Sequence, residues 1–330
     1  MEFSVINMKV AVLLTGALRT IKKTIRFLRR HVLEVAGDQV DVYACVQNDT
    51  AESEAVWREW FEGQIGGYLR DMVWFSNAAE EWAVIRERLL APMPLEESWK
   101  GYLRNSGSMV EYYQLYLAYL RMRAGEQKHS FVYDYVIRAR TDSIFAKPVD
   151  FHWLSWTPEQ CGARMSAVAA GLGTTLDDPR VFQAFMSTLW SDEVLPNLPS
   201  IWTDNQPAPG AARRAVTDEE IQSYVREGRY VLTLRKNNLY VVRRDLFSLI
   251  PAGLGTMYGT FRTKHSDNYW FNAEGQFRAA CYEAGLAVYD YSTDFEEKSL
   301  NYAHSWQEDL FFNAEGELIH PMMLYCVVRK

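Results

Sequence analysis

Continuous apolar runs alternate with amphipathic segments at the start of the chain. The run 9–14 (KVAVLL) is apolar after its first residue and is stopped by Thr15-Gly16. A strand that is apolar on both faces is typical of a parallel sheet covered by helices on both sides. An amphipathic stretch over 20–36 follows, and then a second apolar run over 40–46. This order predicts a β-α-β unit, with which nucleotide-binding sheets begin.

Helical and strand patterns continue along the rest of the chain. Apolar spacings of three and four predict helices, and short apolar runs predict strands. The expected helices are 53–61, 79–90, 108–123 and 268–285, and the expected strands are 72–75, 133–139, 230–234, 239–242 and 286–289. The segment 161–228 is punctuated by prolines and predicts loops over a cleft or a small insertion. We therefore expect one α/β domain over 1–330 with a mostly parallel central sheet.

Composition narrows the class of ligand. The 330 residues are 48% hydrophobic and 23% charged, with a net charge of −7. Basic residues are scattered rather than clustered, so the sequence predicts no nucleic-acid partner. Aromatic residues make up 14% of the chain. That content favours either a partly apolar cleft for a ringed ligand or a core rich in tryptophan.

Cysteine spacing and hydropathy indicate the compartment. The four cysteines lie far apart, without a CxxC pair, which argues against a zinc site or a disulfide framework and suits a reducing compartment. No stretch approaches the ~18 apolar residues of a membrane helix, and the first residues do not have the pattern of a signal peptide. We expect a cytoplasmic protein without a transmembrane segment.

Polar loops follow the first two predicted strands. Thr15, Gly16 and Arg19 lie at the carboxyl end of the first strand, where ligands of open α/β sheets bind. A glycine lets the backbone approach a ligand, the following helix offers N–H groups to an anion, and an arginine fork suits a phosphate. Gln47 and Asn48 follow the second strand and could bind a base or a ribose. The alternatives are a tight turn with a solvated arginine and an ordinary polar loop.

A charged segment ends the strand predicted over 133–139. With a strand period of two, Arg138, Arg140 and Asp142 share one face. Burying two cations and a carboxylate there is costly unless they are paired. A diphosphate ligand would use them, with the arginines neutralising phosphate or holding Asp142 ionised. Asp142 would then bind a ribose hydroxyl or a divalent metal, for which hard oxygen ligands suit Mg²⁺ or Mn²⁺. The alternative is a structural ion pair.

Two carboxylates accompany the late predicted helix. Asp267 and Glu274 are seven residues apart and so lie on one helix face, two turns from each other. A carboxylate among aromatic residues can act as a general base, because burial raises its pKa toward neutral pH. The alternative for Glu274 is a carboxylate that the helix dipole favours.

These segments together resemble a family of small glycosyltransferase-like proteins with the GT-A fold, found in bacteria and large DNA viruses. Residues 12–20 (VLLTGALRT) look like the family's "SGQxRT" opening. Residues 133–145 (YDYVIRARTDSIF), which follow a tyrosine-rich helix, look like its "YDxVIRTRPDxxF" segment. Residues 272–277 and 282–286 are similar to its late helix.

The resemblance implies a GT-A-like three-layer α/β/α fold and a hexosyl- or pentosyltransferase of glycan biosynthesis. A nucleotide-diphosphate-sugar donor would bind in the half before residue 150, and a glycan or glycoconjugate acceptor in the half 151–330. Asp142 would be the last acid of an Asp-x-Asp motif and a ligand of Mn²⁺ or Mg²⁺. Arg140 stands in place of the first acid, so a cation beside Asp142 could take over part of the metal's role. A protein that binds a nucleotide sugar or glycan without turnover is the alternative.

Overall fold

The central sheet contains the strands that the apolar runs predict. The computed structural model describes residues 8–36, 39–91, 97–105, 107–145, 158–178, 180–181, 184–185, 200–201, 219–220, 223–224, 227–234, 239–250, 277, 281, 284–290, 302–303 and 325–328. Within them an eight-stranded sheet has the order β3-β2-β1-β4-β8-β7-β9-β6. Its strands are β1 (Val10–Ala17), β2 (Val40–Gln47), β3 (Leu69–Phe75), β4 (Tyr135–Arg140), β6 (Ser200–Ile201), β7 (Tyr230–Leu234), β8 (Leu239–Arg243) and β9 (Ala287–Asp290).

Most strands of this sheet run in one direction. Strands β3, β2, β1 and β4 are parallel neighbours, and β7 is parallel to β9. Strand β8 is antiparallel to both β4 and β7, and β6 is antiparallel to β9. The expected mostly parallel sheet is confirmed, with β8 as a reversed strand in its centre. A smaller sheet joins β10 (Tyr302–Ala303), β11 (Tyr325–Val328) and β5 (Ser143–Phe145), which follows β4 directly.

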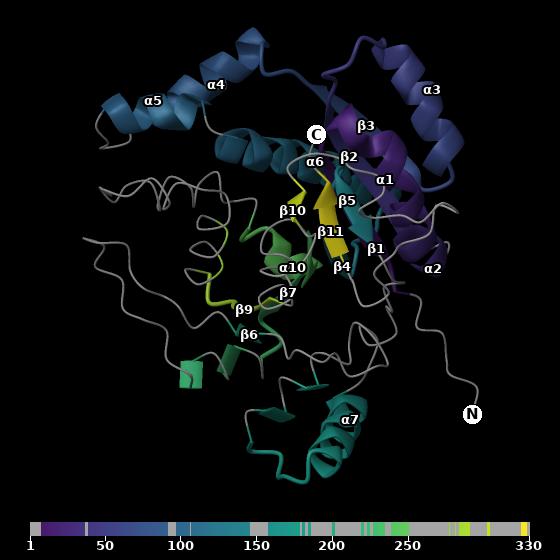
Figure 1. The fold of residues 1–330 in the computed structure, drawn as a ribbon, viewed down its shortest axis with the longest axis vertical. Helices are drawn as coiled ribbons and strands as arrows, with labels where there is room; N and C mark the ends of the chain where they lie inside the picture. The colour runs from purple at the N-terminus through teal and green to yellow at the C-terminus, as the bar shows by residue number, and fades with distance from the viewer. Residues whose placement is uncertain are drawn as a thin grey trace.

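Helices cover both faces of the large sheet, so the fold has three layers (Figure 1). One face packs against α1 (Ile21–Leu28) and α3 (Glu54–Ile65), and the other against α4 (Glu80–Leu90) and α6 (Gly107–His129). Strand β1 shows why: Val10, Val12 and Leu14 point to the first layer, and Ala11 and Leu13 to the second. All five are buried, as a strand covered on both sides requires.

The helix predicted over 20–36 is continuous in space but changes its winding. It begins as a 3₁₀ turn over Leu18–Thr20, continues as α1, widens to a π-helical turn over Arg29–Leu33 and ends as α2 (Glu34–Ala36). The wide turn contains His31, which is buried and whose Nδ1 donates to the carbonyl of Phe145. This contact joins the first helical layer to β5.

Two helices were not expected from the hydrophobic pattern. Helix α5 (Glu97–Asn105) precedes α6, and α7 (Pro158–Gly171) lies partly within the segment for which loops were expected. Met165 and Val168 of α7 pack against the first-layer core. Short helix α10 (Arg244–Phe247) follows β8, and Arg244 makes a fork of two 2.7 Å hydrogen bonds to Glu126 of α6.

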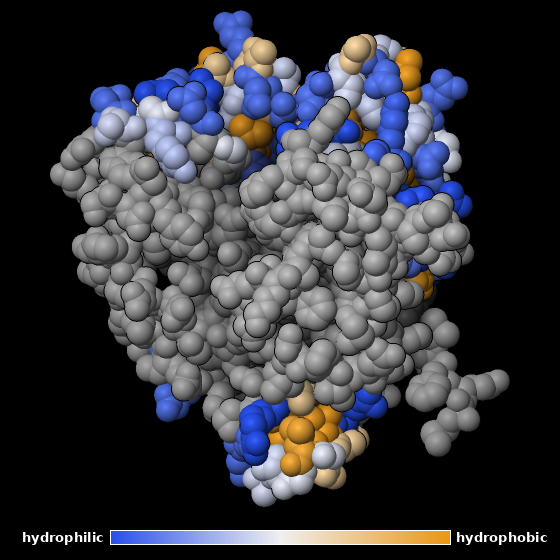
Figure 2. Space-filling model, in the orientation of Figure 1, coloured by the Kyte–Doolittle hydropathy of each residue, from blue (hydrophilic) through white to orange (hydrophobic). Residues whose placement is uncertain are grey.

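The outer surfaces of α3, α4 and α5 are mostly hydrophilic, while apolar residues gather at the α7 end of the molecule (Figure 2). Exposed large hydrophobic residues just after α7 are Leu172 and Leu176. None of the described helices combines the length and the apolar character that crossing a bilayer requires. Cys45 and Cys281 are buried free thiols.

Strands β2 and β4 lie on opposite sides of β1 within the sheet. From β1 it passes through α1 to β2 and β3 on one side, and it then returns through α6 to β4 on the other side of β1. Helices α1 and α6 lie on opposite faces, so their layers diverge at the carboxyl ends of these two strands. This is the topological switch point at which open α/β sheets bind ligands.

Thr141 connects the carboxyl ends of β1 and β4 through hydrogen bonds. Its backbone N–H donates to the carbonyl of Thr15 at 3.0 Å, and its hydroxyl donates to the carbonyl of Ala17 at 2.6 Å. Thr24 of α1 donates in turn to the carbonyl of Thr141 at 2.6 Å. Gly16 between them has φ +133°, and a Cβ there would lie 2.5 Å from the Thr141 hydroxyl oxygen. The glycine is therefore required by this contact.

We expect Gly16→Ala to lower the free energy of unfolding by about 2 kcal/mol, because it adds both backbone strain and a clash with Thr141. Gly63→Ala is the matched control. Gly63 lies in α3 and is exposed, and a methyl group added there would meet no neighbouring group within 4 Å. That change should raise the stability by about 0.5–1 kcal/mol. Urea denaturation measures both, and equal shifts in the two variants would contradict the close contact at Gly16.

Candidate functional site

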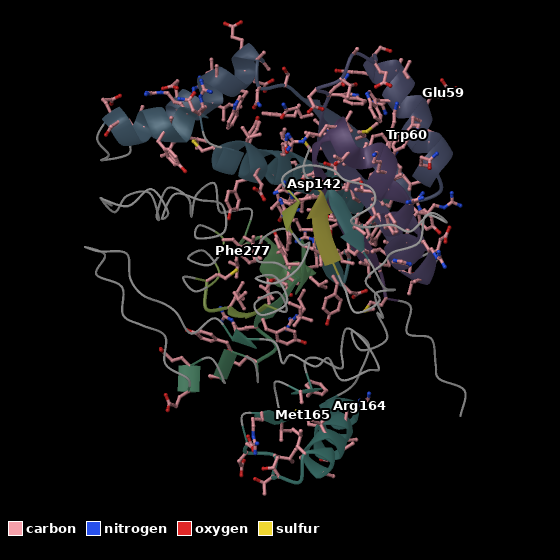
Figure 3. The ribbon with its side chains drawn as sticks, in the orientation of Figure 1. Glu59, Trp60, Asp142, Arg164, Met165 and Phe277 are labelled. Atoms are coloured by element: carbon pink, nitrogen blue, oxygen red, sulfur yellow. The ribbon has the colours of Figure 1, made fainter. Side chains whose placement is uncertain are left out.

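The charged segment lies at the switch point. Strand β4 ends at Arg140, and Thr141 and Asp142 form the turn that leads into β5. Thr15 of β1 is the parallel partner of Arg140. The first polar loop and the charged segment, about 120 residues apart in sequence, are therefore adjacent. Figure 3 shows Asp142 in the middle of the molecule, away from Glu59 and Trp60 on α3 and from Arg164 and Met165 on α7.

Asp142 and Arg140 form a two-pronged ion pair. Arg140 Nε donates to Asp142 Oδ1 and Nη2 donates to Oδ2, both at 2.8 Å. The Asp142 side chain is only 6% exposed and that of Arg140 is 18% exposed. Parallel N–H···O bonds of this kind fix the plane of the guanidinium as well as its position. The hypothesis that an arginine holds Asp142 ionised fits this geometry.

Glu111 of α6 joins both arginines to the helical layer. Arg138 Nη2 donates to Glu111 Oε1 at 2.5 Å, and Arg140 Nη1 lies 3.7 Å from Glu111 Oε2. Both arginines thus reach the α6 face of the sheet, as the strand period predicts. Arg138 is almost completely buried, and Glu111 supplies the carboxylate that this burial demands. Glu111, Arg138, Arg140 and Asp142, here called the charge cluster, carry two positive and two negative charges.

An aromatic wall adjoins the charge cluster. Tyr240 of β8, the neighbour of Arg138 across the sheet, stacks on Phe277 with ring centroids 4.8 Å apart. Burial raises the pKa of Tyr240 and of Tyr112, so both phenols stay neutral. The Tyr240 hydroxyl is buried and has no hydrogen-bond partner among the described residues. Buried aromatic rings therefore adjoin Arg138, and a surrounding of low polarity strengthens its ion pair with Glu111.

The first loop offers one exposed cation. Arg19 is exposed, whereas Thr15 is buried and its carbonyl is bound by Thr141. Gly16 admits the side chain of Thr141, and its expected role of letting a ligand approach the backbone stays a prediction. Of residues 15–20, Arg19 is the exposed one, and its expected role in binding an anion also stays a prediction.

The second loop is structured by its own side chains. Asn48 accepts from the backbone N–H and the hydroxyl of Thr50 at 3.1 and 2.9 Å, and it donates to the carbonyl of Glu52 at 2.8 Å. Gln47 accepts from Asn77 at 3.4 Å. Gln47 is the β2 neighbour of Ala17 and so borders the first loop. The bonds of Asn48 match the polar-loop alternative; a role for either residue in binding a base or ribose stays a prediction.

Asp267 and Glu274, the expected general bases, lie outside the described residues. The described parts of the helix expected over 268–285 include Phe277 and Cys281. They are one helical turn apart, both are fully buried, and both belong to the core beneath α6. Phe277 thus lies against Tyr240 of β8.

The charge cluster does not suit a divalent metal ion. Both oxygens of Asp142 already accept from Arg140, and Mg²⁺ or Mn²⁺ needs about six oxygen ligands. A dication bound to Asp142 would also stand beside the guanidinium of Arg140, and like charges repel. No group of three or more metal-ligating side chains occurs in the described part of the chain. The expected Mn²⁺ or Mg²⁺ on Asp142 therefore finds no suitable donor set there.

Glu111 is the residue that the sequence reasoning missed. It lies within the predicted helix 108–123, next to buried residues, and is only 19% exposed. A carboxylate next to the buried positions of an apolar helix signals a partner on the facing element. The two arginines of the following strand were the available partners.

Comparisons with known proteins add little to this geometry. No protein-family model matches the chain, and no curated protein matches it. Among solved structures, the crystal structure of S. aureus TarS matches with a TM-score of 0.29 and 10% identity. The match covers 88% of this chain and 38% of that chain, so this chain spans well under half the length of TarS. Similarity at this level carries no functional argument, and the fold class rests on the strand order.

We expect Glu111→Ala to lower the free energy of unfolding by about 3 kcal/mol, because it removes a carboxylate from the buried Arg138. Glu87→Ala is the matched control. Glu87, on the neighbouring helix α4, also binds an arginine in a fork, but its side chain is 46% exposed. Its loss should cost less than about 1 kcal/mol. Chemical denaturation decides, and similar losses in the two variants would contradict a structural role for Glu111.

Proposed function

We propose that this protein is a glycosyltransferase that moves a sugar from a nucleotide-diphosphate donor to a hydroxyl of a glycan or related acceptor. The observation that carries the proposal is the meeting of two segments at the switch point. The loop with Arg19 follows β1, and the cluster with Arg140 and Asp142 ends β4. A GT-A-like strand order surrounds them, with the reversed strand β8 beside β4. Anionic ligands of α/β sheets bind at such a position.

The reaction needs neutralisation of a leaving group. The bond between the sugar's anomeric carbon and the diphosphate oxygen breaks, and its electron pair stays on that oxygen. A new bond forms between the anomeric carbon and the acceptor oxygen, which loses its proton. Arg19 and Arg140 are the cations that we assign to the diphosphate, because fixed donors stabilise developing negative charge. Arg138 acts indirectly on Arg140, because it is buried against Glu111, which also lies beside Arg140.

The acceptor proton needs a base if the reaction inverts the anomeric centre. Asp267 and Glu274 remain our candidates, in the half of the chain that we assign to the acceptor. Phe277, which follows Glu274 by three residues in sequence, stacks on Tyr240, the strand neighbour of Arg138. A reaction that retains the configuration would not require this base.

A panel of UDP- and GDP-sugars tests the proposal. The full-length protein should release nucleoside diphosphate from one of them, and release should rise with a suitable acceptor. Asp142→Asn should lower the rate about 100-fold, because Arg140 loses the anion that holds it in place. Because the change also breaks a buried ion pair, the rates are compared well below the thermal unfolding midpoint measured for the variant.

Other outcomes would contradict the assignment. Binding of a nucleotide sugar without release of nucleoside diphosphate would favour a non-catalytic binding protein, the function that the missing first acid of an Asp-x-Asp motif allows. An Asp142→Asn protein with full activity would remove the charge cluster from the site.

Glu274→Gln should lower turnover by about 100-fold while the affinity for donor changes little, because a general base acts on the acceptor and not on the diphosphate. Asp267→Asn, which alters the other candidate, is the matched comparison. Steady-state rates and calorimetric donor affinities separate the two effects. Loss of the fold in Glu274→Gln would instead favour a carboxylate that stabilises its helix.

A further inference from the structure

We infer, on the basis of the proposed function, that the donor diphosphate is held at the end of β4 by the guanidinium of Arg140 without a divalent metal ion. Asp142 and Glu111 are then positioning residues that orient this guanidinium. The inference deepens the proposed function by replacing the expected metal with a side chain of the protein itself.

The bonding of Asp142 is the first argument. Its two oxygens accept from Nε and Nη2 of one guanidinium at 2.8 Å, which is the best geometry that an arginine–carboxylate pair reaches. A metal ion would have to displace or share these bonds while standing beside a fixed positive charge. Asp142 therefore orients the guanidinium of Arg140 and does not bind a cation from solution.

The burial gradient across the charge cluster is the second argument. Side-chain exposure is 2% for Arg138, 6% for Asp142 and 18% for Arg140. Of the two guanidiniums, Arg140 is thus the one that reaches the surface of the cluster. The fork to Asp142 uses Nε and Nη2, while Nη1 lies 3.7 Å from Glu111 Oε2. Phosphate oxygens are the ligands that the planar geometry of a guanidinium matches.

Position distinguishes this fork from similar ones elsewhere. Arg243 and Asp245 form the same two-pronged pair, with distances of 3.1 and 2.6 Å, two residues apart in sequence. Their side chains are 41% and 59% exposed, and Arg243 pairs with Tyr135 at the other end of β4. A fork alone is an ordinary surface feature. The fork of Arg140 is buried and lies at the switch point.

The balance of charge fits this role. The charge cluster is neutral as a whole, so it can be buried without a counterion. An approaching diphosphate would share the guanidinium of Arg140 with Asp142, and Arg19 on the neighbouring loop is an exposed cation outside the neutral cluster. Arg140 then supplies oriented N–H donors and Arg19 supplies the positive charge that a metal ion would otherwise supply.

Calorimetric titration of the full-length protein with UDP and with GDP tests the inference. The dissociation constant of the nucleotide that binds should agree within about twofold between EDTA and excess Mn²⁺. The double variant Arg140→Gln/Asp142→Asn keeps a neutral hydrogen-bonding pair, which protects the fold. It should weaken binding about tenfold or more in both buffers.

The matched control is Arg243→Gln/Asp245→Asn, which alters the exposed fork and should leave the affinity unchanged. Thermal unfolding of both double variants separates a positioning effect from loss of the fold. Equal weakening by the two double variants would overturn the inference, as would an affinity that rises about tenfold or more when Mn²⁺ replaces EDTA.

Electron paramagnetic resonance of Mn²⁺ with the protein alone provides an independent measurement. We expect no bound Mn²⁺ in the wild type. Bound Mn²⁺ that Asp142→Asn releases would overturn the inference, whether or not a nucleotide binds. If neither UDP nor GDP binds in either buffer, the proposed function fails and this inference fails with it. A nucleotide that binds only with Mn²⁺ leaves the proposed function standing and removes the inference alone.

Discussion

The parallel pairing of β1 with β4 is the constraint on which the rest of the structure depends. It brings together two polar segments that are distant in sequence, and it creates the point where the α1 and α6 layers diverge. Thr141, which follows β4 directly, fixes the pairing at its carboxyl end through two hydrogen bonds to backbone carbonyls of β1. Without this register, Arg19 and Arg140 would not share one end of the sheet. The proposed donor site thus depends first on the order of the strands, which brings the two segments together, and then on their side chains.

The first half of the fold could be predicted because its signals are local. The apolar runs that form β1 and β2 are continuous, and the helix of α6 repeats its apolar positions at spacings of three and four. Helix α5 repeats the same spacing over only nine residues, shortly after the break at Pro92 and Pro94, and was not predicted. The sequence also did not predict that β8 runs antiparallel to its neighbours, because the apolar pattern of a strand is the same in both directions. Direction is decided by connections and pairing, which the hydrophobic period does not contain.

The candidate site could be predicted in part for the same reason. Strand period placed Arg138 and Arg140 on one face, and both do reach Glu111. The choice of partner depended on how α6 crosses the sheet, so Glu111 could not be found from the strand alone. The contact of Gly16 with Thr141 was also not predictable from the glycine alone, because it depends on the pairing of β1 with β4. The roles of Asp267 and Glu274 remain predictions.

The long separation between β1 and β4 has a consequence for how the protein acquires its shape. Strand β1 can pair with β2 soon after both are synthesised, because about 30 residues separate them. Its other edge must wait for β4, about 125 residues later, and contacts of such high sequence separation slow folding. During synthesis one edge of β1 therefore stays open, and exposed strand edges invite pairing with other chains. The charge cluster assembles only when this edge closes, so a newly made chain gains the β1–β4 pairing and its proposed donor site in the same step.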